Sequence, residues 1–110
     1  MAYFYEVSFD LEKDEIDELE MGHSLQRVLG FLKVNLPGQT GHVTSSAMYS
    51  VDDAERTRVV FMSEWNTWED VINHCESALF EDKVITEFGP RITAERLTHR
   101  FYAEVGTETY

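Results

Sequence analysis

Residues 61–80 read FMSEWNTWEDVINHCESALF, and this stretch contains the clearest structural signals in the chain. Aromatic and β-branched residues predominate up to Trp65, so residues 57–65 are predicted to form a strand. Thr67, followed three residues later by Asp70, fits a capping box, so a helix is expected to begin near Trp68. The stretch therefore predicts a strand, a tight turn and a capped helix.

Two apolar stripes follow the predicted cap at helical spacing. The first stripe consists of Trp68, Val71, Ile72 and Cys75. Ser77 is predicted to restart a helix whose apolar face consists of Phe80, Val84, Ile85 and Phe88. Gly89 and Pro90 should end this helix, because proline cannot extend it.

The remaining chain contains three further predicted strands, at residues 3–9, 42–51 and 92–105. Between the first two, residues 12–36 are rich in helix formers, with Asp10 as the expected N-cap and Pro37-Gly38 as the stop. Ile16 and Leu19 lie on the opposite side of the helical wheel from the apolar stripe of residues 25–36. Two interpretations remain open: a break near Gly22, which is favoured, or one long helix covered on one side by the sheet and on the other by a partner chain.

The predicted order is β-α-β-β-α-β, with the last helix in two pieces. This order is typical of a ferredoxin-like α+β fold, in which an antiparallel sheet carries its helices on one face, and residues 1–110 are expected to form one such domain. Alternation divides the strand residues into an apolar set that includes Tyr5, Val7 and Phe61, and a mixed set that includes Glu6 and Arg100. Because both sets need cover, a homodimer with sheets packed face to face is expected.

Charge, hydropathy and cysteine content limit the partners and the location that can be expected for this protein. Nine basic and 21 acidic residues give a net charge of −12, which argues against nucleic acid or an anionic membrane surface as a partner. No apolar stretch approaches the ~20 residues of a membrane span, and the N-terminus lacks the pattern of a signal peptide, so a cytoplasmic location is expected. The single cysteine, Cys75, excludes an internal disulfide.

The central run, with a strand ending in Glu64-Trp65, a capped helix, His74, and then Ser77 and Phe80, resembles the antibiotic biosynthesis monooxygenase family of the dimeric α+β barrel superfamily. Leu79 stands where that family often has a second histidine. The resemblance implies an aromatic-lined pocket and cofactor-independent oxygenation of quinol- or anthrone-like aromatic substrates, with no cofactor. Other relatives degrade haem, and Val84 occupies the place of their iron ligand, so tight haem binding is not expected.

The residues themselves suggest roles within such a pocket. His74 is the candidate proton acceptor, with Glu64 and Glu81 as polar groups that orient the substrate. Trp65, Trp68 and Phe80 are the candidate aromatic walls, although both tryptophans also suit the core. His74 lies to one side of the first stripe, so the pattern leaves open whether it lines the pocket or faces solvent.

The sequence contains no pattern typical of a zinc site or of a phosphate-binding loop. The four histidines lack the spacing of a preformed zinc site, and no glycine-rich phosphate loop is present. Glu6 and Glu64 suit either a cavity lining or ion pairs with Arg96 and Arg100. The alternative to an enzyme is a non-catalytic small-molecule-binding or dimerisation module on the same fold.

Overall fold

The structure is a computed structural model that describes residues 2–12, 17–77, 79–89, 92 and 96–109. In chain order its elements are β1 (Tyr3–Glu12), α1 (Glu18–Asn35), the 3-10 helix η1 (Leu36–Gly38), β2 (His42–Tyr49), β3 (Arg56–Trp65), α2 (Trp68–Ser77), α3 (Leu79–Phe88) and β4 (Thr98–Ala103). The four strands form one antiparallel sheet in the order β2-β3-β1-β4. This is the predicted ferredoxin-like α+β fold.

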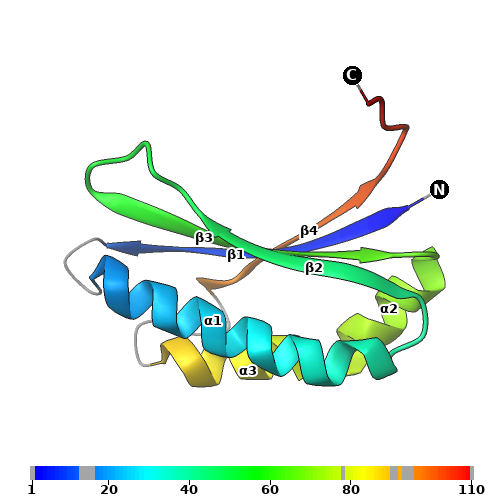
Figure 1. The fold of residues 1–110 in the computed structure, drawn as a ribbon, viewed down its shortest axis with the longest axis horizontal. Helices are drawn as coiled ribbons and strands as arrows, with labels where there is room; N and C mark the ends of the chain where they lie inside the picture. The colour runs from blue at the N-terminus through cyan, green and yellow to red at the C-terminus, as the bar shows by residue number, and fades with distance from the viewer. Residues whose placement is uncertain (1, 13–16, 78, 90–91, 93–95, 110) are drawn as a thin grey trace.

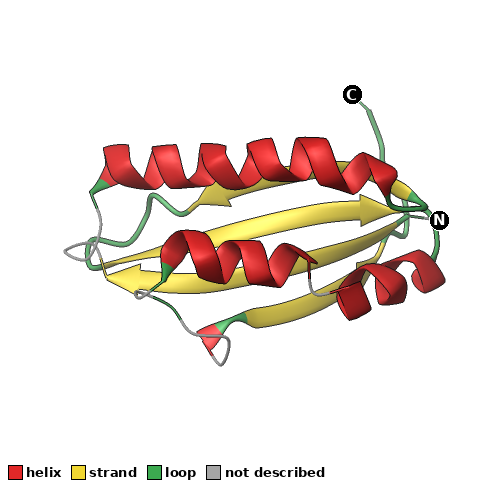
Figure 2. Ribbon diagram, turned by 90° about the horizontal axis from the view of Figure 1, so that it is seen from below, coloured by secondary structure: helices red, strands yellow, loops and turns green. Residues whose placement is uncertain are grey.

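All of the labelled helices lie on one face of the sheet, and the other face is open (Figure 1). Seen from the helix side, α1 runs along the sheet beside the shorter α2 and α3 (Figure 2). None of the described helices combines the length and the apolar character that a membrane crossing requires.

The apolar set of strand residues is the one that meets the helices. Tyr5, Val7 and Phe9 of β1 are buried, and so are Val59 and Phe61 of β3. Val7 is paired with Phe61 and Phe9 with Val59, so these side chains form adjacent rows on one face. They pack with the buried stripes of α1 and α3 into one core.

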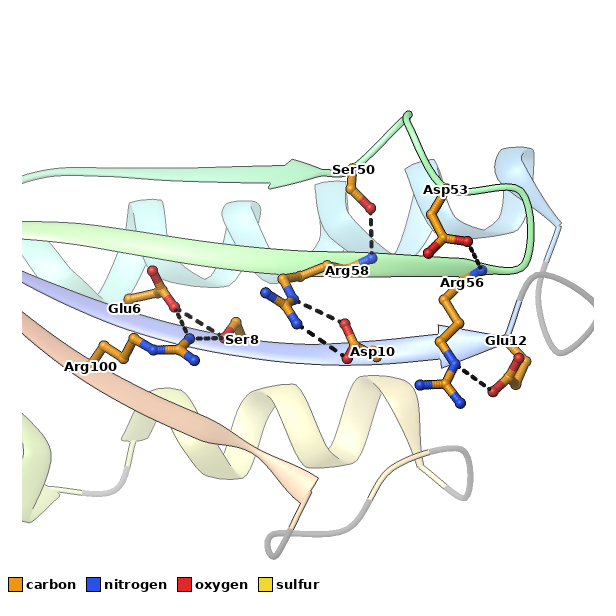
Figure 3. A network of polar contacts seen from close by, with 9 residues as sticks. All are labelled: Glu6, Ser8, Asp10, Glu12, Ser50, Asp53, Arg56, Arg58 and Arg100. Atoms are coloured by element: carbon orange, nitrogen blue, oxygen red, sulfur yellow. Dashed lines mark hydrogen bonds and ion pairs between the residues drawn. The ribbon is translucent and has the colours of Figure 1, made fainter.

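Ion pairs on the open face connect side chains of neighbouring strands (Figure 3). Arg100 Nη1 lies 2.9 Å from Glu6 Oε2, and Arg58 Nε lies 3.0 Å from Asp10 Oδ1. Burial alone raises the pKa of the Glu6 carboxyl, but hydrogen bonds from Arg100, Tyr102 and Ser8 outweigh burial and hold that pKa below its ordinary value. The predicted pairing of Glu6 with Arg100 is therefore confirmed.

The prediction that Asp10 caps the first helix was wrong. Asp10 lies within β1, which continues to Glu12, and Asp17 is the N-cap, accepting a hydrogen bond of 2.8 Å from the Glu20 amide. Arg58 of β3 lies opposite Asp10 and forms an ion pair with it. The Asp10 carboxylate, which the sequence suggested as a helix cap, therefore has its charge balanced by a neighbouring strand. Residues 13–16 of the predicted acidic helix, Ile16 included, lie outside the described residues.

The break predicted near Gly22 is also absent, and α1 is continuous from Glu18 to Asn35. Met21 is buried and lies one turn before Leu25, on the same face of the helix as Val28 and Leu32. The buried face of α1 therefore continues on both sides of Gly22. One interior glycine costs a helix only about 1 kcal/mol, which this packing offsets. Leu19, on the other side of α1, is 71% exposed.

Two further boundaries differ from the prediction. Ser77 is the last residue of α2 rather than the start of the next helix. The final strand is Thr98–Ala103, shorter than residues 92–105, because Ile92 and Leu97 are buried in the core without strand pairing. Residues 93–95 of the predicted strand lie outside the described residues. The stops at Pro37-Gly38 and after Phe88 are confirmed.

Candidate functional site

The site is built around His74, whose position is set by the cap of α2. The Asp70 amide donates to Thr67 Oγ1 over 3.1 Å, which fixes the first turn. Val71 and His74 then face the sheet, and His74 is only 3% exposed. The buried face of α2 therefore contains His74, whereas the sequence stripe had been expected to centre on Trp68, Val71 and Cys75.

Aromatic rings surround the imidazole of His74. It stacks on Trp65 with ring centroids 4.5 Å apart and an interplanar angle of 28°. The Tyr5 ring meets it edge-on at 5.7 Å, and the Phe80 ring lies 6.3 Å away. These contacts exclude water from the imidazole and leave it few polar partners.

Gln39, just beyond η1, supplies one such partner. Its Oε1 lies 2.7 Å from His74 Nδ1. An amide oxygen only accepts hydrogen bonds, so Nδ1 donates and carries the proton. The neutral ring consequently has its free lone pair on Nε2, the nitrogen able to accept a proton or a hydrogen bond.

Burial lowers the pKa of His74 to about 4, and the nearby His42 contributes to the decrease. His42 contacts the edge of Trp65, with ring centroids 5.2 Å apart, so the two histidines share one tryptophan. Burial also lowers the pKa of His42. At pH 7 His74 is neutral, and in the free protein it is a good hydrogen-bond acceptor but a weak base.

The space around His74 is small. The cavity between sheet and helices has a volume of about 10 Å³, room for about one water molecule, and is lined by Leu32, Leu36, Ser45, Ser46, Phe61, Met62, Ser63, His74 and Phe80. A more open hollow of about 200 Å³ adjoins His74 and is lined by Gln39, Thr40, Trp65, Asp70, Asn73 and His74. Another hollow, of about 210 Å³, lies away from His74, between the start of α1 and residues 49–51.

The structure brings together three of the residues singled out from the sequence: His74, Trp65 and Phe80. Trp65 is fully buried and donates from Nε1 to Ser63 Oγ over 2.8 Å. Its ring backs His74 rather than offering a free face to a ligand. Phe80 of α3 packs edge-on against Phe61 and closes the inner side of the site.

Glu81 is half-buried close to this group. Burial is the main cause that raises the pKa of the Tyr5 phenol and of the Cys75 thiol, and the Glu81 carboxylate contributes to both increases. Glu81 is therefore near enough to act on the Tyr5 side of the site.

Glu64 and Trp68 are placed elsewhere. Glu64 pairs with Phe4 and lies on the open face of the sheet, opposite the face that carries His74. Trp68 is 46% exposed and contacts Tyr3 and Phe101 at the rim of the sheet, with ring centroids 6.1 Å and 5.5 Å away. The expectation that both tryptophans belong to the core was correct for Trp65 and wrong for Trp68, which is the first residue of α2 and is 46% exposed.

Sequence reasoning missed Gln39 and the role of Tyr5. Tyr5 belongs to the same strand set as Trp65, which is a usable signal for a shared face. Gln39 follows a helix stop and carries no such pattern. Within the described chain, no three His, Cys, Asp or Glu side chains are grouped as a metal site.

Comparisons with known proteins match the fold. No family model matches the chain, and no curated protein does. A solved Bacillus cereus structure described as an antibiotic biosynthesis monooxygenase is similar at 16% identity with a TM-score of 0.64, covering 99% of this chain and 98% of that one. SnoaB, a cofactor-independent oxygenase from Streptomyces nogalater, is similar at 14% identity with a TM-score of 0.61, covering 97% of each chain.

A dimeric ferredoxin-like protein from an uncultured marine organism has 13% identity and a TM-score of 0.60, with 98% of each chain covered. At these identities the likeness concerns the fold. The resemblance seen in the central run is thus confirmed at the level of three-dimensional structure: the chain has the ferredoxin-like fold of solved antibiotic biosynthesis monooxygenases.

Proposed function

We propose that this protein binds a small aromatic molecule at His74 and oxygenates it without a cofactor, the substrates being quinol- or anthrone-like. One observation carries the proposal: a buried, neutral histidine held by Gln39 in the tautomer that leaves Nε2 able to accept a proton. The likeness in fold to SnoaB supports the same reaction class.

The reaction requires little of the protein. An anthrone-type substrate loses a proton to His74 Nε2, and the resulting anion supplies the electrons that reduce O₂. The CH₂ carbon becomes a carbonyl carbon that keeps one oxygen atom, and the other oxygen atom leaves as water. Phe80 and Tyr5 exclude solvent from this step, and Glu81 is the candidate polar group that orients the substrate.

The low basicity of His74 limits which substrates can react. A general base works best when its pKa lies near the working pH, and that of free His74 lies well below it. The developing negative charge of a bound substrate would raise the pKa of His74. Substrates with an acidified CH₂ or OH group should therefore react, and simple phenols should not.

A second function is favoured by the nearly filled interior. Ligand pockets generally have volumes of ~300–1,000 Å³, and the cavity beside His74 measures about 10 Å³. A fused-ring substrate would have to displace Phe80 or enter from the hollow near Asn73. If neither happens, the chain is a non-catalytic binding or dimerisation module.

The test uses anthrone as the probe. Oxygen consumption is followed with an electrode, and binding is followed by emission of Trp65 in a Trp68→Phe background. The proposal expects saturable quenching of Trp65 and anthraquinone formation that His74→Gln abolishes. The control is His23→Gln, which alters an exposed histidine of α1 and should retain full activity.

The outcomes separate the two functions. Quenching without oxygen consumption supports a binding module. Neither quenching nor consumption, in protein that is folded by circular dichroism, rules out this substrate class. Equal loss of activity in His74→Gln and His23→Gln would show that His74 has no special role.

A further inference from the structure

Tyr5 carries a polar contact that the proposed reaction does not use. Its phenol oxygen lies 2.5 Å from Nδ1 of His99, although the Tyr5 side chain is only 5% exposed. His99 lies on β4, at the edge of the sheet, and is exposed. A buried phenol is thus joined directly to a histidine that reaches solvent.

The sheet register creates this pair. Tyr5 is opposite Phe101 on β4, and His99 is opposite Val7, so the three rings of Tyr5, Phe101 and His99 point to the helix face from neighbouring positions. The Tyr5 ring is nearly parallel to both partners, at 14° to His99 and 15° to Phe101. The phenol oxygen of this stacked pair lies beside the imidazole, 2.5 Å from Nδ1.

The Tyr5 ring also meets His74 edge-on, with ring centroids 5.7 Å apart. Tyr5 therefore contacts both the histidine of the candidate site and the exposed His99. Cys75 is another polar neighbour of the phenol, and burial keeps that thiol protonated by raising its pKa. The ring nitrogen within hydrogen-bond distance of the phenol oxygen is His99 Nδ1.

We propose that Tyr5 and His99 form a one-electron redox pair that reduces organic radicals formed at the His74 site. The phenol of Tyr5 gives one electron to the radical, which becomes an anion, and the phenol proton moves to His99 Nδ1. The products are a neutral tyrosyl radical and an imidazolium. A solvent-borne thiol then returns one electron to Tyr5 and becomes a thiyl radical as its proton passes to water, and the phenol proton returns from His99.

The contact with His99 Nδ1 is what makes Tyr5 suited to this role, in the tautomer in which that nitrogen accepts the phenol hydrogen. A phenol that loses an electron becomes a strong acid, so its oxidation is easiest where a base already accepts its hydrogen bond. The role of the Tyr5–His99 pair in turnover rests on the proposed function, because a substrate anion that passes one electron to O₂ forms an organic radical beside Tyr5. Without that function, the pair remains a redox site with the same intrinsic chemistry.

The intrinsic chemistry is tested without any substrate. Wild-type protein carrying ring-deuterated tyrosine is irradiated with tris(bipyridine)ruthenium and persulfate, frozen, and examined by electron paramagnetic resonance. We expect a long-lived neutral tyrosyl signal, narrowed by the deuterium label. Tyr5→Phe should lose this long-lived signal, and the control Tyr49→Phe, which alters a tyrosine bonded to Glu18, should retain it.

His99→Gln tests the proton transfer more specifically, because glutamine can still accept a hydrogen bond from Tyr5 but cannot take up the phenol proton. Loss of the long-lived signal in His99→Gln supports the pair. A signal that persists unchanged in Tyr5→Phe or in His99→Gln overturns the proposal. Both variants keep side chains of similar size, and melting curves establish that they are folded.

A second measurement links the pair to turnover. With anthrone and O₂, Tyr5→Phe should release less superoxide per anthraquinone formed than wild-type protein, measured as cytochrome c reduction, because a substrate radical that Tyr5 has reduced no longer combines with superoxide. If no turnover occurs, the proposed function fails while the resonance experiment still decides the redox pair. Turnover with identical superoxide release in both proteins would show that Tyr5 does not reduce substrate radicals during turnover.

Discussion

His74 shows how strongly burial can change one side chain. The imidazole is stacked on Trp65 and bonded to Gln39, and its pKa of about 4 keeps it neutral over the physiological range. An ordinary histidine has a pKa of about 6.5, so unfolding restores basicity to this ring. The fold consequently excludes a proton that the unfolded chain would bind.

This exclusion predicts a loss of stability in acid. Between pH 6.5 and pH 4 the unfolded state binds the proton and the folded state does not, so stability falls as the pH falls. From pH 7 to pH 5 the loss due to His74 should be about 2 kcal/mol, at 1.36 kcal/mol per pKa unit. Urea unfolding of wild-type and His74→Gln at both pH values measures it. An equal change in both proteins would contradict the assignment.

The difference in burial between the two tryptophans predicts that their replacement by alanine lowers stability by different amounts. Trp65→Ala should cost about 3–5 kcal/mol, because it removes a fully buried ring and the support of His74. Trp68→Ala should cost clearly less, since that ring is 46% exposed. Thermal melting of both variants gives the comparison, and a Trp65→Ala variant that melts like wild type would identify Trp65 as a pocket wall instead.

At the scale of elements, continuous packing decided whether α1 breaks. Gly22 looks like a break in the sequence, but Met21 and Leu25 on either side of it are both buried. The glycine tolerates its helical position because the stripe of α1 meets the core without interruption.

Gly22→Ala should therefore stabilise the protein by about 0.5–1 kcal/mol, since a Cβ at Gly22 meets nothing within 4 Å and alanine suits a helix better. Gly41→Ala is the opposite case. Gly41 has φ +81°, and the carboxylate of Asp70 occupies the space of its Cβ, so this variant should be destabilised. Urea midpoints of the two variants test the contrast; destabilisation by Gly22→Ala would reveal strain within α1.

At the scale of the whole molecule, the open face of the sheet is the surface that a second copy would cover. Tyr102 of β4 lies on this face, opposite Phe4, and is 43% exposed. The open face combines ion pairs with half-buried Val60 and Met62. This mixture suits a polar-rimmed interface.

A homodimer through this face is therefore expected, with at least ~1,000 Å² buried in total. Light scattering at micromolar concentration should give twice the chain mass. Val60→Lys on the open face should shift the protein toward monomer, and Val34→Lys, at an exposed position of α1, should leave the dimer intact. A wild-type monomer would refute the expectation.

Local patterns in the chain were enough to predict the order of strands and helices, the cap at Thr67, the helix stops and the division of each strand into two faces. These features depend on residues a few positions apart, which interact in any context. Three features became visible only in the folded chain: the Tyr5 face meets the helices, His74 is buried and neutral, and Glu64 lies on the opposite face of the sheet from His74. His74 bonds a residue 35 positions away, and Tyr5 bonds one 94 positions away. Burial and electrostatics at the site arise from such distant neighbours, which local patterns do not encode.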